Sequence, residues 1–370
     1  MRLTGCNPWM SFVQPDLLLL KILHEPRAAA SLSLKDWDLL IRQARQFDLL
    51  GRIGALLEEC ELLEVVPTQP REHLLWGRVA AQRHELAVHA EIAHVQKALD
   101  SVGVPVILLK GAAYAIAKLP PAGGRFFSDI DILVPKESLN AVEAALLMHG
   151  WTASHHDAYD EHYYRAWMHE LPPMQHVKRM TVIDVHHAIV PQTAPVQPDP
   201  IKLRAAARSI EGFANLLVLG PADMVLHSAV HLFHDGEFDH GLRDLVDIDA
   251  LLRHFGSRSE FWNELVQRAE EMQLSRPLFY ALRYAERFLK TPVPTSARQA
   301  ANAAKPNPLL LHCMDALFRR GIVGGEPWNP EHPALLSHFL LYVRANALRM
   351  PPLLLARHLF HKAFLSPRKE

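Results

Sequence analysis

Residues 129–134 (DIDILV) constrain the fold more than any other stretch of the sequence. Side chains alternate between the two faces of a β-strand, so a strand here places Asp129 and Asp131 together on one face and the aliphatic residues on the other. Carboxylates held this close repel each other unless a cation lies between them. Mg²⁺ typically binds one or two protein carboxylates together with phosphate oxygens. The segment therefore predicts a metal–nucleotide site, and a solvated edge strand is the alternative.

The residues before this segment predict a place for phosphate. Residues 104–109 (VPVILL) are typical of a buried strand, and they end at Lys110 and Gly111. Residues 112–118 are expected to form a helix, whose first backbone N–H groups would point toward an anion. Arg125 adds a positive charge just before the aspartates. The order strand, Lys-Gly turn, helix and acidic strand thus predicts a phosphate cradle beside a metal clamp.

A second acidic strand is predicted over residues 181–187 (TVIDVHH). Its alternation places Asp184 and His186 on one face and the aliphatic residues Ile183 and Val185 on the other. The alternative interpretation is that Asp184 is a structural aspartate on an edge strand, held in a salt bridge.

These motifs resemble the DNA-polymerase-β-like nucleotidyltransferase superfamily, and within it the bacterial family of uncharacterised nucleotidyltransferases. In that family the turn reads Lys-Gly, as at Lys110-Gly111, and the second motif reads Arg…Asp-Ile-Asp-Leu-Leu-Val, as at Arg125 and residues 129–134. The sequence departs from the commoner superfamily pattern because Ala112 follows the glycine, where a serine or a second glycine usually stands. No hydroxyl is therefore available there for phosphate.

The resemblance implies an α+β fold, in which a small mixed β-sheet forms a nucleotidyltransferase core embedded in a mainly helical chain. It implies Mg²⁺-dependent transfer of a nucleoside monophosphate from an NTP to a hydroxyl acceptor, with release of pyrophosphate and two ions expected. Asp184 is expected to supply a third carboxylate that holds a metal and acts as or positions the base. The residues implied for catalysis and metal binding are Asp129, Asp131 and Asp184, and those for phosphate are Lys110, Gly111, Arg125 and Ser128. His186 is expected to orient Asp184 or to contact phosphate.

Two later helices are expected to complete the nucleotide pocket. His227, His231 and His234 are spaced to share one face of a helix over residues 221–233, with Asp235 following. That face is interpreted as cleft lining, an interior stripe or a transition-metal site. The last interpretation would make the chain a metal-dependent phosphohydrolase.

The next helix, residues 242–255, carries several acidic residues. An Arg243–Asp247 pair is expected at i, i+4 spacing, and Asp244, Asp247 and His254 are expected to face the cleft. The resembled family has a similar pair of helices, so His227, His231, Arg243 and Asp244 are predicted to bind the nucleotide. A solvated acidic face is the alternative.

An aromatic cluster precedes the second acidic strand. It comprises Tyr159, Tyr163, Tyr164 and Trp167. Such side chains can stack on a base, and the alternative is a packed surface helix.

The motif match covers roughly residues 104–190. Predicted segments are 1–70, an N-terminal helical flank; 71–200, the nucleotidyltransferase core; 201–290, a helical domain that completes the cleft; and 291–370, a C-terminal helical region with a basic end. Ser33 and Asp36 predict a capped helix start in the first segment.

Composition limits the partners. The net charge of −1 provides no overall basic field for nucleic acid, and it mildly disfavours RNA. The three cysteines form neither a zinc nor a disulfide pattern, so a cytoplasmic protein is expected. Neither a signal peptide nor a run apolar enough to cross a membrane is evident. The acceptor stays open among small molecules, glycan precursors, proteins and tRNA. A non-catalytic nucleotide- or partner-binding module on the same fold is the other alternative.

Overall fold

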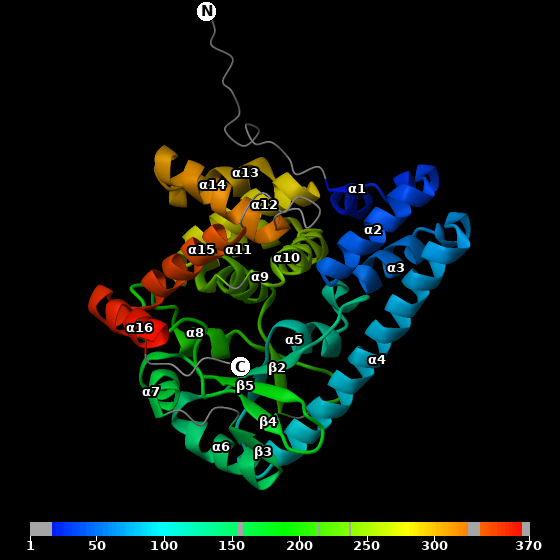
Figure 1. The fold of residues 1–370 in the computed structure, drawn as a ribbon. Coiled ribbons are helices and arrows are strands. Elements are labelled where there is room, and N and C mark those ends of the chain that lie inside the picture. The colour runs from blue at the N-terminus through cyan, green and yellow to red at the C-terminus, as the bar shows by residue number, and fades with distance from the viewer. Residues whose placement is uncertain (1–16, 154–157, 214, 237, 325–333, 365–370) are drawn as a thin grey trace, which may run out of the picture.

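The computed structural model describes residues 17–153, 158–213, 215–236, 238–324 and 334–364 (Figure 1). Its centre is a seven-stranded mixed sheet with the strand order β3-β4-β5-β2-β1-β7-β6. The strands are β1 (Val106–Leu108), β2 (Asp129–Leu133), β3 (Trp151–Ala153), β4 (Met174–His176), β5 (Val182–His186), β6 (Arg208–Ser209) and β7 (Leu216–Val218). The surrounding elements are mostly helices, which confirms the predicted α+β class.

The register of the central strands places the acidic residues side by side. β2 and β5 run parallel with Asp131 opposite Asp184. β1 lies antiparallel on the other side of β2, and the N–H of Leu109 donates to the carbonyl of Asp131 at 3.0 Å. The aliphatic residues between the aspartates are buried, as the alternation predicted. Both acidic strands are therefore interior strands of the sheet.

A helical flank precedes the sheet. Ser33 and Asp36 form the predicted capping box at the start of α2. The long helix α4 runs diagonally from this flank to the far side of the sheet in Figure 1. The flank comprises α1 (Leu18–His24), η1 (Pro26–Ser31), α2 (Leu34–Gln46), α3 (Leu50–Glu59), η2 (Leu63–Val65) and α4 (Thr68–Leu99).

The helices inserted between the strands are short. The helix after β1 begins at Lys110 and ends at Ile116, earlier at both ends than the predicted 112–118. Lys110 itself has a φ of +43°, a left-handed conformation that is uncommon for a residue with a Cβ. These elements are α5 (Lys110–Ile116), η3 (Pro120–Ala122), η4 (Lys136–Ser138), α6 (Leu139–Met148), α7 (Ala158–Trp167) and α8 (Pro200–Ala205).

A bundle of helices lies above the sheet in Figure 1. The predicted helix over residues 221–233 ends as an α-helix at Val230 and continues as a π-helix, which Gly236 ends with a φ of +73°. The bundle comprises α9 (Pro221–Val230), η5 (His231–Asp235), α10 (Gly241–Phe255), α11 (Ser259–Glu271), α12 (Ser275–Leu289), α13 (Thr295–Ala301), η6 (Asn302–Ala304), α14 (Pro308–Val323) and α15 (Ala334–Arg349). The last helix, α16 (Pro352–Phe364), lies beside α7 in Figure 1.

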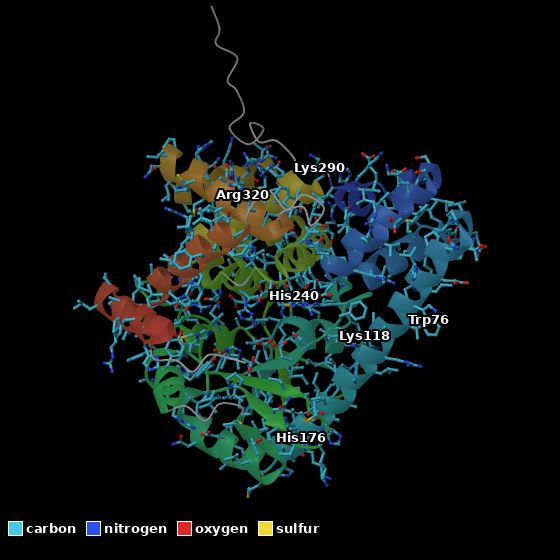
Figure 2. The ribbon with its side chains drawn as sticks, viewed as in Figure 1. Trp76, Lys118, His176, His240, Lys290 and Arg320 are labelled. Carbon is cyan, nitrogen blue, oxygen red and sulfur yellow. The ribbon has the colours of Figure 1, made fainter. Side chains whose placement is uncertain are left out.

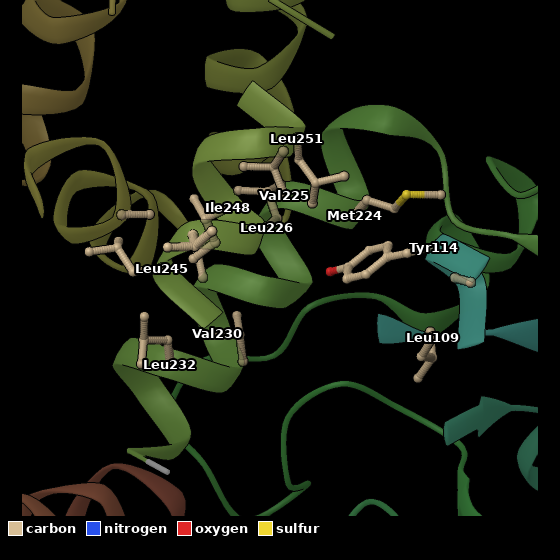
Figure 3. Packing of buried hydrophobic residues seen from close by; sticks show 14 of the residues in the cluster. Leu109, Tyr114, Met224, Val225, Leu226, Val230, Leu232, Leu245, Ile248 and Leu251 are labelled. Atoms are coloured by element: carbon tan, nitrogen blue, oxygen red, sulfur yellow. The ribbon is translucent and has the colours of Figure 1, made fainter. Parts of the chain in front are cut away.

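One hydrophobic core joins the sheet to the bundle. Figure 3 shows Tyr114 of α5 directed toward Val225 and Leu226 of α9, which in turn pack against Leu245 and Ile248 of α10. The same cluster includes residues from all four segments predicted from the sequence, and the division into those segments stays a prediction. Among the described residues, no helix is long and apolar enough to cross a bilayer.

Candidate active site

A cavity of about 340 Å³ lies between the sheet and the bundle. His240, which lines it, lies between these two halves in Figure 2. The residues that were predicted to catalyse the reaction or to bind metal, phosphate or nucleotide all line this cavity. They are Lys110, Gly111, Arg125, Ser128, Asp129, Asp131, Asp184, His186, His227, His231, Arg243 and Asp244. We call the side formed by Asp129, Asp131 and Asp184 the strand wall, and the side formed by His227, His231, Asp244 and Asp247 the helix wall.

The three aspartates of the strand wall converge. One carboxylate oxygen from each of Asp129, Asp131 and Asp184 lies within 4.8 Å of the others. Ser128 Oγ donates to Asp129 Oδ1 at 2.7 Å, which orients the first carboxylate. Three carboxylates at this spacing are the oxygen-rich ligand set that Mg²⁺ prefers.

Asp131 is the aspartate whose charge the protein stabilises. Lys110 Nζ and His186 Nε2 each lie 3.0 Å from its Oδ1. Burial favours the neutral carboxyl, but the charge of Lys110 and the hydrogen bond from His186 outweigh it and hold the pKa of Asp131 well below its usual range. Asp131 is therefore ionised, although its side chain is almost fully buried.

Asp184 is in the opposite situation. Its Oδ1 is buried and has no hydrogen-bond partner in the described part of the chain. Burial, followed by the charges of Asp131 and Glu170, raises the pKa of Asp184 to about 8. A buried acceptor without a donor is costly, and a cation bound between Asp184 and its neighbours would remove that cost. The residues present thus fit a divalent metal ion.

His186 does not contact Asp184 in the way the sequence suggested. Its Nε2 donates to Asp131, and its Nδ1 lies 3.1 Å from Glu170 Oε2. Burial lowers the pKa of His186, but the charges of Glu170 and Asp131 dominate and raise it. Glu170 and the adjacent His169 also line the cavity. The sequence analysis assigned neither to the site, and their only signal was a His-Glu pair after the aromatic cluster.

The Lys-Gly turn is tightly packed. A Cβ on Gly111 would lie 2.9 Å from an Arg125 nitrogen and 3.0 Å from the Phe127 ring, so a larger residue there would displace the Arg125 side chain. The left-handed backbone of Lys110 directs its side chain to Asp131. The turn therefore connects the predicted cradle to the strand that carries Asp129 and Asp131.

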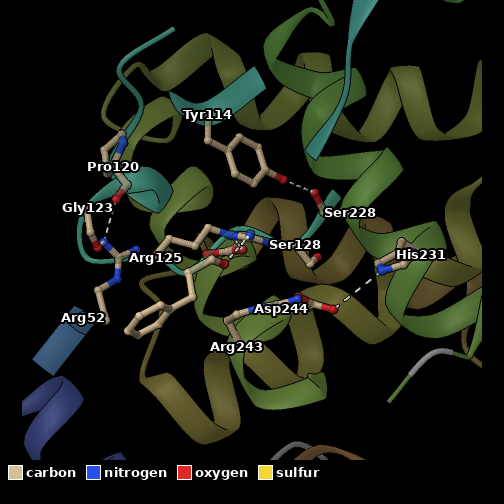
Figure 4. Close-up of polar contacts among 12 residues, drawn as sticks. Arg52, Tyr114, Pro120, Gly123, Arg125, Ser128, Ser228, His231, Arg243 and Asp244 are labelled. Atoms are coloured by element: carbon tan, nitrogen blue, oxygen red, sulfur yellow. Dashed lines mark hydrogen bonds and ion pairs between the residues drawn. The ribbon is translucent and has the colours of Figure 1, made fainter. Parts of the chain in front are cut away.

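Arg125 forms an ion pair with the helix wall. Its Nε donates to Asp247 Oδ2 at 2.8 Å, and both side chains are nearly buried. Burial lowers the pKa of Arg125, but the charges of Asp247 and Asp244 raise it further above its usual value. The predicted Arg243–Asp247 pair is wrong, because Arg243 donates to Asp244 at 3.1 Å (Figure 4), whereas Asp247 pairs with Arg125.

The π-helix changes which histidines face the cavity. His227 and His231 line it, and His231 lies 3.7 Å from Asp244 (Figure 4). His234 does not line it and instead lies 3.3 Å from Asp235, which does. The wider π-helical turn breaks the i, i+7 alignment that a regular helix would have given. Burial, and then the charges of Lys110 and His186, lower the pKa of His227 to about 3.

Two sequence predictions fall elsewhere. His254 lines a separate cavity of about 560 Å³ between α1, α3 and α10, so its predicted place in the cleft is wrong. Of the aromatic cluster, Tyr163 and Tyr164 line the cavity, Trp167 does not, and the side chain of Tyr159 lies outside the described residues.

Further contacts tie the walls together. Tyr114 Oη lies 2.7 Å from Ser228 Oγ, joining α5 to α9 (Figure 4). Since Ser228 donates to the carbonyl of Met224, Tyr114 is the donor. Arg349, at the end of α15, lines the cavity and lies 3.4 Å from Asp235. The sequence analysis missed these contacts.

The comparison with known families agrees with this geometry. A family model described as an uncharacterised nucleotidyltransferase matches residues 33–290. The chain belongs to this nucleotidyltransferase family. The family predicted from the motifs is thus confirmed, and the match extends well beyond residues 104–190. No curated protein matches the chain.

Family membership and the three aspartates together support a nucleotidyltransferase in general terms. The family implies a nucleotide as substrate. Among the described residues, no group able to hold a metal contains His227, His231 or His234. The geometry therefore gives no support to a hydrolytic metal site on that helix.

Proposed function

We propose that this nucleotidyltransferase moves a nucleoside monophosphate from an NTP to a hydroxyl group and releases pyrophosphate, with Mg²⁺ as cofactor. This proposal rests on the convergence of three carboxylates within 4.8 Å, one of which has a buried oxygen with no partner in the parts of the chain that the structure describes. Asp129, Asp131 and Asp184 would hold the metal, and two ions are expected. Bound Mg²⁺ neutralises charge on phosphate oxygens and polarises the attacking hydroxyl.

In this reaction, protein side chains would accept the proton of the attacking hydroxyl and bind the phosphates. As the acceptor oxygen bonds to the α-phosphorus, its proton passes to the Asp184 carboxylate, and the bond from the α-phosphorus to the pyrophosphate oxygen breaks. Lys110, the N–H of Gly111 and Arg125 line the cavity where the phosphates would lie. Positive charge placed there stabilises the negative charge of the transition state.

The helix wall is proposed to bind the rest of the nucleotide. Burial keeps His227 and His231 neutral, so each ring offers one hydrogen-bond donor and one acceptor. Arg243 and Asp244 add polar groups, and Tyr164, which also lines the cavity, would stack on the base.

The acceptor class stays open among small molecules, glycan precursors, proteins and tRNA. A macromolecular acceptor would have to present its hydroxyl to a cavity of about 340 Å³.

Cys60 and Cys313 are exposed free thiols. Exposed free thiols suit a reducing compartment, and we propose the cytoplasm.

Thermal unfolding with each of the four NTPs, with and without Mg²⁺, tests this function. An NTP at about 100 times its dissociation constant is expected to stabilise the wild type by about 2.7 kcal/mol. The Asp129→Ala/Asp131→Ala variant is expected to lose that shift, each variant being compared with its own ligand-free sample. Asp38→Ala, an exposed change in α2, is the matched control and should keep it.

Release of labelled pyrophosphate from the bound NTP then distinguishes transfer from binding alone. No shift with any NTP, or an equal shift in the double variant, would contradict the proposal. A shift without pyrophosphate release in the presence of acceptor candidates would favour the non-catalytic binding module.

A further inference from the structure

A second group of metal-ligating side chains lies beside the three aspartates. One ligand atom from each of His169, Glu170 and His186 lies within 4.8 Å of the others. Both histidines are buried, and the carboxylate is partly buried. Their elements lie together, because the chain that follows α7 forms a β-bridge with β5.

The backbone fixes the relative position of these residues. Glu170 and His186 form an antiparallel β-bridge. The N–H of His187 donates to the carbonyl of His169 at 2.8 Å, and the N–H of Leu171 donates to Val185 at 2.9 Å. One backbone hydrogen bond on each side of the bridge makes the group rigid. A rigid arrangement lowers the ordering cost of binding an ion.

Two ring nitrogens in this group lack hydrogen bonds. Nδ1 of His169 and Nδ1 of His186 are both buried with no hydrogen-bond partner among the described residues. The 3.1 Å approach of His186 Nδ1 to Glu170 Oε2 lies outside hydrogen-bond geometry. Buried polar atoms in native proteins normally have partners. Lone pairs left without donors, next to a carboxylate, are what a metal ion uses.

The other nitrogen of His186 is already engaged. Its Nε2 donates to Asp131 Oδ1 at 3.0 Å. Histidines that bind a metal through one ring nitrogen usually donate the other N–H to a carboxylate, which fixes the tautomer and raises the basicity of the ligand. Asp131 plays that part here, so His186 has the hydrogen-bonding pattern of a metal ligand.

The chemistry of this group differs from that of the three aspartates. Two imidazoles and one carboxylate suit borderline transition ions such as Zn²⁺, whereas carboxylates alone suit Mg²⁺. Three protein ligands of this composition leave one coordination position open. We propose that His169, Glu170 and His186 form a separate site for a divalent transition-metal ion, with Zn²⁺ the best match. The proposal does not depend on the transferase reaction.

The ligand atoms need only a small adjustment. Atoms around a tetrahedral zinc at about 2.0–2.1 Å lie about 3.4 Å apart. The three ligand atoms lie within 4.8 Å of one another, so side-chain rotation of both His169 and Glu170 toward His186 would bring them to that spacing.

Zinc content of tag-free protein tests the proposal. Chelator-stripped protein is equilibrated with buffered Zn²⁺, and bound metal is measured by mass spectrometry. Wild type and Asp129→Asn are expected to bind about one Zn²⁺ per chain. His169→Ala and the isosteric Glu170→Gln are expected to bind it at least about 100-fold more weakly, since loss of even a hydrogen-bond partner of a ligand costs roughly 10–100-fold.

His240→Ala is the matched control, because His240 lines the same cavity but lies outside the proposed ligand group. It should retain the metal. Visible absorption of the Co²⁺-substituted wild type provides a readout that needs no variant, since low-coordinate Co²⁺ bound by histidine gives intense bands. Equal zinc binding by wild type and Glu170→Gln would overturn the proposal. Zinc lost in Asp129→Asn but kept in His169→Ala, or Co²⁺ without such bands, would do the same.

Discussion

The two walls of the cavity differ in how their charges are balanced. On the helix wall, Asp247 pairs with Arg125, and Asp244 contacts Arg243 and His231. On the strand wall, Asp131 is paired, but Asp184 has a buried oxygen that lacks a partner among the described residues. The carboxylates of the helix wall are thus satisfied by protein partners, whereas the strand wall keeps one buried oxygen that they do not satisfy.

This difference suggests that the helix wall mainly holds the two halves of the protein together, whereas the strand wall is suited to bind a ligand. Groups that satisfy each other hold the two halves together whether or not a ligand is bound. Groups that conflict, such as the raised Asp184 beside the ionised Asp131, reduce stability until something from outside neutralises them. We therefore expect substitutions on the two walls to have opposite effects on stability.

The largest expected effect is on the helix-wall ion pair. Arg125→Ala leaves Asp247 buried without its partner and should lower the free energy of unfolding by about 3–5 kcal/mol. Arg42→Ala removes an exposed i, i+4 pair with Asp38, and this control should cost about 0.5 kcal/mol or less. Urea denaturation measures both. Similar losses in the two variants would show that the walls are not joined through this contact.

The next largest effect is on the strand wall, where a substitution is expected to raise the free energy of unfolding rather than lower it. The pKa of Asp184 is about 8 in the folded chain and about 3.9 when unfolded, so the folded state binds more protons between these values. Stability from this group therefore falls as pH rises, by about 3 kcal/mol from pH 5 to 7. Asp184→Asn should remove that slope and stabilise the metal-free protein at pH 7. Parallel pH profiles for wild type and variant, measured in chelator, would contradict this.

The smallest effect returns to the helix wall. The pKa of His227 is about 3 when folded and about 6.5 when unfolded, so the folded state binds fewer protons between these values. Its contribution is complete above pH 6.5 and is lost as pH falls, by about 2 kcal/mol at pH 5. His227→Gln should flatten this acid branch, whereas His149→Gln, at an exposed position, should leave it unchanged. If the stability of His227→Gln still falls by the same amount below pH 6.5, then other groups cause that loss of stability.

The strand wall was predictable because its determinants are local. Alternation in residues 129–134 and 181–187 placed the aspartates on one face of each strand, and the parallel register then set Asp131 opposite Asp184. The family resemblance implied that Asp184 joins the other two aspartates at the metal. Fold class and family followed from the same motifs, and the comparison with known families confirms both.

The helix wall was only partly predictable because its partners are distant in sequence. Arg125 and Asp247 are 122 residues apart, so a local i, i+4 pair with Arg243 was the only partner that spacing could suggest. The π-helix, which turns His234 away, has no sequence periodicity of its own. Glu170 belongs to an irregular connection whose position depends on the β-bridge to His186. The catalytic and binding roles of the residues stay predictions.

The position of Arg349 shows that the cavity is lined by residues from outside the stretch that matches the family. The family match ends at residue 290, yet Arg349 lines the cavity and Tyr163 stacks on His358 of α16 at 4.8 Å. The carboxylates and part of the surface around them thus belong to different stretches of the chain. Changes confined to the last two helices can therefore alter the lining of the cavity while leaving the three carboxylates intact, so these two parts of the cavity can evolve independently.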